Sequence, residues 1–460
     1  MRTNSLQSKD IAHQIHPATN LRRHERVGPI VIDRGSGIYV YDDEGREYIE
    51  GLAGLWSVGV GFGEKRLVEA ATRQMAKLPY YHIFAHKTHE PSTLLAEKLV
   101  SMAPANLKHV FFTSSGGEAN DSAIKFVWYY NNALGRTDKK KFIARQGAYH
   151  GITIAAGSLT GLQANQRGFD LPLPFAKHLT CPHYYRFGLP GESEEAFTER
   201  LAKELEDLIL SEGPDTVGAF IGEPLMGAGG VIVPPVNYWQ RIQEVCRKYD
   251  VLVIADEVIN GFGRLGTLFG CDTFGIRPDI LVCSKQITSS YQPLAAVLIS
   301  DEMYQAMADQ SDRLGTFGHG YTASAHPVAT AVALENLAII EERNLVANAA
   351  EVGAHLHAGL SRFADHPLVG EVRGRGLLAA IELVVDKEKK TPLPASAEPS
   401  RRIFDRAWAN GLVIRAFPTG VLGYAPPLCC SESDIDAIIA RTARTLDQTL
   451  ADPDVRQAMP

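Results

Sequence analysis

Six apolar segments between residues 109 and 300 constrain the fold more than any other feature of the chain. They read HVFFTSS, KFIARQG, VGAFIGEP, VLVIADEV, DILVCSK and LAAVLIS, and helix-like patterns separate them. Their apolar residues are consecutive rather than alternating, which indicates strands covered by helices on both faces. The sequence therefore predicts an α/β fold with a mainly parallel sheet.

Polar residues follow several of these segments, and they include Ser115, Glu223, Asp256 and Lys285. Because functional residues on a parallel sheet gather at the carboxyl ends of its strands, we expect all four in one crevice. An amine such as Lys285 can form a Schiff base, and a carboxylate such as Asp256 can hold a pyridinium nitrogen. Pyridoxal phosphate chemistry needs these two groups most. The alternative is that Lys285 merely ends a strand in water.

A candidate phosphate-binding segment lies upstream, at residues 109 to 130. It reads as a strand, a glycine-rich turn and then a helix that we expect to open at Glu118. Gly116 and Gly117 would let the backbone approach an anion, and the helix would offer its free N–H groups and positive dipole end. Taken alone, two glycines in such a turn can also serve only a tight bend.

Composition excludes several classes of protein. The 460 residues are 45% hydrophobic and 22% charged, which are ordinary globular values. The net charge of −7 argues against nucleic-acid and acidic-membrane binding, so we expect small molecules or copies of the chain as partners. The first twenty residues resemble no signal peptide and no apolar run could span a membrane, so we expect a cytoplasmic protein. The six cysteines show no CxxC spacing, which favours reduced, packed thiols.

Both ends of the chain differ from its middle. Residues 37 to 54 are typical of a hairpin that turns at Asp42 to Gly45, and residues 370 to 430 mix short strands with turns. An exposed loop is expected at 391 to 400, and a last long helix from about Ser431. We assign both ends to a smaller domain. The expected division is 1–65 as an N-terminal segment and part of the small domain, 66–330 as the large domain, and 331–460 as the C-terminal small domain.

Two other motifs offer rival interpretations. The stretch GFGRLG at 261 to 266, followed by Asp279, matches a dinucleotide-binding fingerprint, but that fingerprint requires a helix where this chain has further glycines and a proline. His82, His86 and His89 are spaced as if on one helix face and could suggest zinc. Acidic or thiol partners at ligand spacing are almost absent, so we expect no metal site.

Together the motifs resemble class III aminotransferases of pyridoxal 5′-phosphate (PLP) fold type I, and the resemblance spans most of the chain. The motifs are SSGGEAND at 114–121, AYHGIT at 148–153, IGEPLMGAGGVI at 221–232, VLVIADEVINGFGRLG at 251–266, SKQITSSYQPLAAVLIS at 284–300 and HGYTASAHP at 319–327. Residues 51–63 and 411–417 look most like the ω-transaminases, the amine or β-alanine:pyruvate group. The resemblance implies a large domain with a helix-covered sheet and a smaller α+β domain from both termini.

The resemblance also implies roles for individual residues. Lys285 would form the Schiff base with PLP and shuttle a proton, and Asp256 would face the pyridine nitrogen. Tyr149 would stack on the ring, with Val258 against its other face. The implied cofactor contacts are Ser115, Gly116, Gly117, Tyr149, His150, Glu223, Asp256, Val258, Lys285 and, from a second subunit, Thr322. The family more often has serine at Gly117, so one hydroxyl contact is missing here.

The same resemblance implies a substrate pocket and an activity. The matching wall positions are Leu55, Trp56, Phe84, Ala228 and Ile259, while Arg415 matches an arginine that pairs with the carboxylate of the acceptor. We therefore expect an amino group to pass from a primary amine or ω-amino acid to pyruvate, in a homodimer with shared active sites or a tetramer. The alternatives are a polyamine or amino-acid transaminase with another acceptor such as 2-oxoglutarate, an aminomutase, a non-catalytic PLP-fold protein, or an NAD-dependent oxidoreductase.

Overall fold

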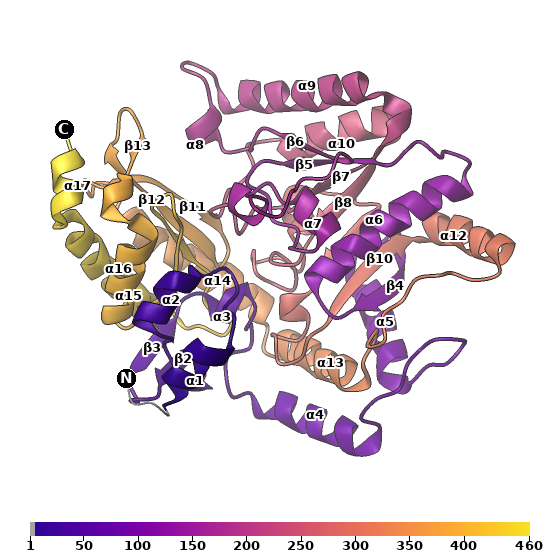
Figure 1. The fold of residues 1–460 in the computed structure, drawn as a ribbon, viewed down its shortest axis with the longest axis horizontal. Coiled ribbons are helices and arrows are strands. Elements are labelled where there is room, and N and C mark those ends of the chain that lie inside the picture. Colours follow the sequence, from indigo (N-terminus) through magenta and orange to yellow (C-terminus); the bar gives the residue numbers. More distant parts are fainter. Residues whose placement is uncertain (1–4) are drawn as a thin grey trace.

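A seven-stranded sheet lies at the centre of residues 5–460, the part of the chain that the computed structural model describes (Figure 1). Its order is β4-β10-β9-β8-β7-β5-β6. The strands are β4 (Leu107–Thr113), β5 (Lys141–Arg145), β6 (Ala176–Leu179), β7 (Val217–Gly222), β8 (Leu252–Asp256), β9 (Ile280–Cys283) and β10 (Ala295–Ser300). Strand β10 runs antiparallel to both of its neighbours and the other pairings are parallel, which confirms the mainly parallel sheet. The sequence analysis missed β6, a short edge strand with two half-buried residues.

Helices cover both faces of this sheet, which explains the consecutive apolar residues. On β9, Ile280 and Val282 belong to the buried cluster that includes α6, whereas Leu281 and Cys283 belong to the cluster on the other face, with α9 and α10. The helices of this region are α6 (Gly116–Ala133), α7 (Ile154–Leu159), α8 (Tyr184–Phe187), α9 (Glu194–Glu212), α10 (Tyr238–Lys248), α11 (Gly270–Phe274) and α12 (Asp301–Leu314). Each central strand therefore needs apolar side chains at every position.

A long helix connects the sheet to the rest of the chain. Helix α13 (Pro327–Glu342) packs against α4 (Lys65–Lys77) and α5 (Glu90–Met102). The division expected at 330/331 falls in the first turn of α13, and the domain boundaries remain a prediction.

The two ends of the chain meet in a second region, on the left of Figure 1. Strand β14 (Leu412–Val413) pairs in parallel with β3 (Glu47–Glu50), which itself forms an antiparallel hairpin with β2 (Tyr39–Asp42). The hairpin turns at Asp42–Gly45, as expected. The other strands here are β1 (Ile32–Ser36), β11 (Val369–Arg375), β12 (Leu378–Asp386), β13 (Thr391–Pro392), β15 (Arg415–Ala416) and β16 (Val421–Tyr424). The helices are α1 (Leu6–His13), α2 (Leu21–Val27), α3 (Ala53–Trp56), α14 (Leu345–Ser361), α15 (Pro399–Ala409), α16 (Glu432–Leu450) and α17 (Pro453–Ala458).

The stretch expected to be an exposed loop at 391–400 is more ordered than the sequence indicated. It contains β13, and α15 begins at Pro399. Ile403 and Ala407, four residues apart, are buried, so one face of α15 packs into this second, smaller region. The final helix begins where expected, because Ser431 and Asp434 form a capping box at the start of α16.

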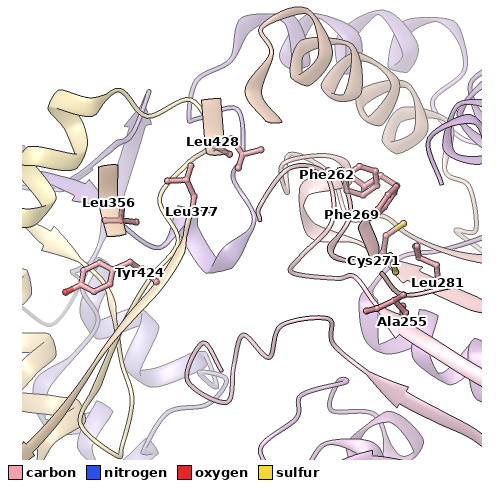
Figure 2. Packing of buried hydrophobic residues seen from close by; sticks show 14 of the residues in the cluster. Ala255, Phe262, Phe269, Cys271, Leu281, Leu356, Leu377, Tyr424 and Leu428 are labelled. Carbon is pink, nitrogen blue, oxygen red and sulfur yellow. The ribbon is translucent and has the colours of Figure 1, made fainter. Parts of the chain in front are cut away.

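One buried apolar cluster extends through both regions. Figure 2 shows Phe262, Phe269 and Leu281 on the sheet side, and Leu377 and Tyr424 on the side of the small region. All of them belong to the same cluster of buried residues. Because burial of large apolar side chains provides most of the driving force for folding, this continuity ties the two regions together.

Two expectations from composition can be compared with the structure. All six cysteines lie in the described part of the chain as free thiols, five of them buried and Cys429 half-buried. Among the helices of residues 5–460, none has the length and apolar character to cross a membrane.

Candidate active site

Asp256 is the last residue of β8, and three hydrogen bonds fix its buried carboxylate. Its Oδ2 accepts from the side-chain amide of Asn120 (2.9 Å) and lies 2.8 Å from Nδ1 of His150. Its Oδ1 accepts from the N–H of Val258 at 3.1 Å. A carboxylate only accepts hydrogen bonds, so Nδ1 of His150 carries the proton. The sequence analysis missed Asn120, although it lies in the glycine-rich motif one turn into α6.

Lys285 follows β9 and Ser284, and it opens a 3₁₀ turn. Its backbone is in the left-handed region, with a φ of +48°. Burial lowers the pKa of the Lys285 amine to about 8, against the opposing charges of Asp256 and Glu223. A larger fraction of this amine is therefore neutral near pH 7 than of an ordinary lysine.

Helix α6 begins at Gly116, two residues before the expected start at Glu118. The reason is Ser115, whose Oγ accepts from the N–H of Glu118 at 3.2 Å and caps the helix. Gly116 and Gly117 are thus the first two helical residues rather than the turn. Within residues 5–460, no backbone hydrogen bond uses their N–H groups, which leaves them available to an anion.

The start of α6 lies against the ends of β8 and β9. A Cβ atom added to Gly116 would lie 3.1 and 3.2 Å from the two methyl groups of Val258, and 3.8 Å from Cβ of Ser284. Val258 comes two residues after Asp256, and Ser284 directly precedes Lys285. The structure therefore brings the glycines, the acid and the amine into one crevice.

Glu223 follows β7 and is buried beside Arg145. Nη2 of Arg145 donates to the main-chain oxygen of Glu223 at 2.7 Å and lies 3.6 Å from its Oε2. Burial raises the pKa of the Glu223 carboxyl to about 7, offset in part by His150 and Arg145. The sequence analysis did not single out Arg145, because an arginine at a strand end is more often exposed.

These groups fit PLP, whose aldehyde, pyridine nitrogen and phosphate each need a different partner. Lys285 offers the amine, Asp256 a buried carboxylate, and the first two residues of α6 offer free N–H groups. Tyr149 and Val258 are half-buried and so leave side-chain surface that a ring could cover. The site therefore has a partner for each reactive part of the cofactor.

Apolar residues from several segments form one side of the proposed substrate pocket. Trp56 and Ile259 are buried in one cluster with Phe417. Gly227 directly precedes Ala228 in the chain, and a Cβ added to Gly227 would lie 2.5 Å from Cδ1 of Ile259. Phe417 was not predicted from the sequence.

Arg415 lies next to this cluster. Its guanidinium carbon is 5.6 Å from the centre of the Phe417 ring. A Cβ on Gly423 would be 3.3 Å from Trp56 and 3.5 Å from Cβ of Arg415. Partial desolvation lowers the pKa of Arg415, although a guanidinium stays charged at neutral pH.

The remaining predicted site residues are exposed. Leu55 is 58% exposed and Phe84 is 45% exposed. Phe84 lies against Gly320, where an added Cβ would be 3.0 Å from its ring, and the hydroxyl of Tyr80 donates to the main-chain oxygen of Thr322 at 2.9 Å. The contribution of Thr322 to a second subunit remains a prediction.

The rival motifs do not form the sites that they suggested. No helix begins within GFGRLG, because α11 starts only at Gly270. Asp279 directly precedes β9 and accepts from the N–H of Val253 (2.8 Å). It therefore lies near the amino ends of the strands, whereas Asp256 lies at the carboxyl end of β8. Residues 82 to 86 lie outside any helix, and His89 caps α5. Among residues 5–460, side chains that could ligate a metal ion come together at two other places. One is Asp10 with His16 and His24, and the other is His183 with Glu371 and Glu382.

Several known proteins are similar to this chain. The model of the family described as aminotransferase class-III matches residues 21–446. A probable gamma-aminobutyrate transaminase 3 of mitochondria from Oryza sativa subsp. indica is 49% identical over 422 residues, which are 92% of this chain and 82% of that protein. A thermostable six-fold mutant of the omega transaminase from Pseudomonas jessenii has a TM-score of 0.96 and 60% identity, over 97% of this chain and 99% of its own. The omega transaminase of the same organism in complex with PMP is 59% identical, with the same TM-score and coverage. The chain therefore belongs to the class III aminotransferases and is a PLP-dependent transaminase.

Proposed function

We propose that this transaminase moves an amino group from a primary amine or an ω-amino acid to pyruvate, by a ping-pong cycle through pyridoxamine phosphate. The observation that carries the proposal is the pairing of an apolar wall, formed by Trp56 and Ile259, with the adjacent guanidinium of Arg415. An uncharged amine needs the wall, and a keto acid needs the guanidinium.

The donor side rests on the residues around Ala228. This side chain is small and half-buried, and its loop packs against Ile259 through Gly227. A modest hydrophobic substituent fits beside such a residue. The plant relatives are named for γ-aminobutyrate, which is itself an ω-amino acid, and the Pseudomonas structures are named omega transaminases. Both names support a donor that either has no carboxylate or carries its carboxylate far from the amine.

The acceptor side rests on the number of available guanidiniums. Arg145 and Arg264 are fully buried near the crevice, and both donate to main-chain oxygens. Among the guanidiniums that residues 5–460 place beside the pocket, Arg415 is the remaining candidate to bind a carboxylate. Pyruvate has one carboxylate and 2-oxoglutarate has two, so one guanidinium favours pyruvate. An acceptor with a second carboxylate would require another cationic partner.

The residues of the chain divide the chemical work. PLP, when bound, supplies the electron sink that stabilises negative charge at the amine-bearing carbon of the substrate. Lys285 moves the proton from that carbon, and its lowered pKa leaves part of the amine neutral and able to accept it. Asp256, held by Asn120, His150 and Val258, would stabilise positive charge on the pyridine nitrogen of PLP. The free N–H groups at the start of α6 would bind the phosphate of PLP.

Two further parts of the proposal concern assembly and location. Exposed Leu55, Phe84 and Thr322 are expected to be covered in a homodimer, in which Thr322 completes the phosphate site of the other subunit. We also place the enzyme in the cytoplasm, consistent with its six free thiols, which are buried or half-buried.

A panel of amine donors, assayed against both pyruvate and 2-oxoglutarate, tests the proposal. We expect arylalkyl amines and ω-amino acids to react with pyruvate at least about tenfold faster than with 2-oxoglutarate, the ratio expected from one unmatched charge. Comparable rates with both acceptors would contradict the pyruvate assignment. A product whose amino group stays on the donor's own carbon skeleton would identify an aminomutase.

A further inference from the structure

The backbone that follows Lys285 is unusual. Lys285, Ser289 and Ser290 have φ values of +48°, +48° and +58°, and none of them is glycine. Side chains disfavour this left-handed region, so the surrounding structure must hold such residues in place. The catalytic amine is therefore carried by a turn whose conformation depends on contacts outside it.

A buried amide on a distant helix supplies several of those contacts, in addition to the bonds that the Gln286 side chain makes with Gly261 and Arg264. Asn336 lies in α13 and is 0% exposed. Its Nδ2 donates to the main-chain oxygens of Gln286 (2.7 Å) and Ile287 (3.1 Å), and its Oδ1 accepts from the hydroxyl of Ser289 at 2.7 Å. All the hydrogen-bonding capacity of this nitrogen is thus directed at the turn that carries Lys285.

The neighbourhood of Asn336 makes this arrangement specific. On the same helix, Ala333, Leu337 and Ile340 are buried apolar residues that belong to the cluster shown in part in Figure 2. Burying an amide among apolar residues costs free energy unless its hydrogen bonds are made. The bonds of Asn336 therefore fix the position of the turn relative to α13.

We propose that Asn336 is a positioning residue for Lys285. Its carboxamide fastens residues 286–289 to α13 and so holds the left-handed turn from which the lysine side chain reaches the crevice. The bonds within the turn do not do this alone, because they join Lys285 to Thr288 and Ser290, which move with it. Proton transfer is sensitive to such placement, since a displacement of about 1 Å can reduce a rate by about 100-fold.

The test compares two isosteric substitutions in the enzyme loaded with PLP. Asn336→Asp keeps the size of the side chain but removes both N–H donors. Asn348→Asp is the matched control, because Asn348 on α14 also donates to two main-chain oxygens, those of Leu428 and Cys430, away from the lysine turn. Each variant is assayed for kcat and KM, and the visible absorbance of the substrate-free enzyme is titrated with pH. That absorbance reports the environment of the lysine without any turnover.

For Asn336→Asp we expect kcat to fall by about tenfold or more while KM changes by less than about threefold. We also expect its absorbance midpoint to move by at least about half a pH unit, and neither effect in Asn348→Asp. Normal kcat and midpoint in Asn336→Asp, or equal losses in both variants, would overturn the proposal. If Asn336→Asp does not fold, Ser289→Ala decides. It removes the bond to Asn336, together with the longer bond (3.3 Å) that Ser289 Oγ accepts from the N–H of Val60, and it should shift both readouts in the same direction. An unchanged Ser289→Ala would then count against the inference.

Discussion

Replacing Asp256 with asparagine gives the sharpest test of the site, because the change removes a charge and almost no volume. The carboxylate is 2% exposed, so no water can take its place. A contacting carboxylate raises the pKa of a ring nitrogen by about 1–3 units, and each unit corresponds to about 1.4 kcal/mol. We therefore expect kcat to fall by about 10- to 1,000-fold.

The hydrogen bonds predict a second, smaller effect on stability. Oδ2 of Asp256 accepts from Asn120 and His150, while Oδ1 accepts from the N–H of Val258. Asparagine has one oxygen, so it can serve one side and must present its NH₂ to the other. One buried donor then loses its partner, which costs about 1–3 kcal/mol and should lower the melting temperature by a few degrees.

The assay follows formation of alanine from pyruvate with saturating PLP, and a melting curve accompanies it. Asp279→Asn is the control, because Asp279 directly precedes the neighbouring strand β9 and also accepts one main-chain N–H, near the amino ends of the strands. It should keep full activity. Activity within about threefold of the parent in Asp256→Asn would refute our assignment of the electrostatic role.

The remaining predictions concern other parts of the site and its surroundings. Arg415→Ala should raise the KM for pyruvate by about 10- to 100-fold, the value of a charged hydrogen bond, and leave the amine half-reaction unchanged; equal effects on both half-reactions would contradict this. Gly117→Ser should tighten PLP binding, measured by fluorescence titration, because an added Cβ would lie an ordinary 3.7 Å from Thr153 and the hydroxyl adds a donor; weaker binding would count against a phosphate at this position. The rate at which PLP-free enzyme takes up PLP should rise with pH to a midpoint at about 8, since the neutral amine of Lys285 attacks the aldehyde, and a midpoint near 10.5 would be inconsistent with the buried lysine. Burial raises the pKa of Glu50 to about 8, so the stability that its neutral form contributes is complete below the unfolded value of about 4.5 and is lost as pH rises through 8. Glu50→Gln should therefore raise the melting temperature at about pH 9 and leave it unchanged at about pH 4; an equal gain at both would exclude titration as the cause.

The sequence predicted the parts of this protein that depend on neighbouring residues. Consecutive apolar residues on strands such as β9 indicated a sheet with two covered faces, and Ser431 with Asp434 marked the start of α16. Two predictions about helix boundaries were wrong for reasons confined to a few neighbouring residues. Helix α6 starts two residues early because Ser115 caps it, and α15 was missed because prolines obscured the spacing of Ile403 and Ala407.

The amino-acid sequence by itself determined the fold class and the residue types that PLP chemistry requires, because periodicity and short motifs are properties of adjacent residues. Only the tertiary structure decided which side chains support them. Asn120 and Asn336 are ordinary helical asparagines in the sequence, yet one holds Asp256 and the other holds the turn of Lys285. The physical reason is that a hydrogen bond acts within about 3 Å, and folding brings together atoms that are 136 and 50 residues apart along the chain.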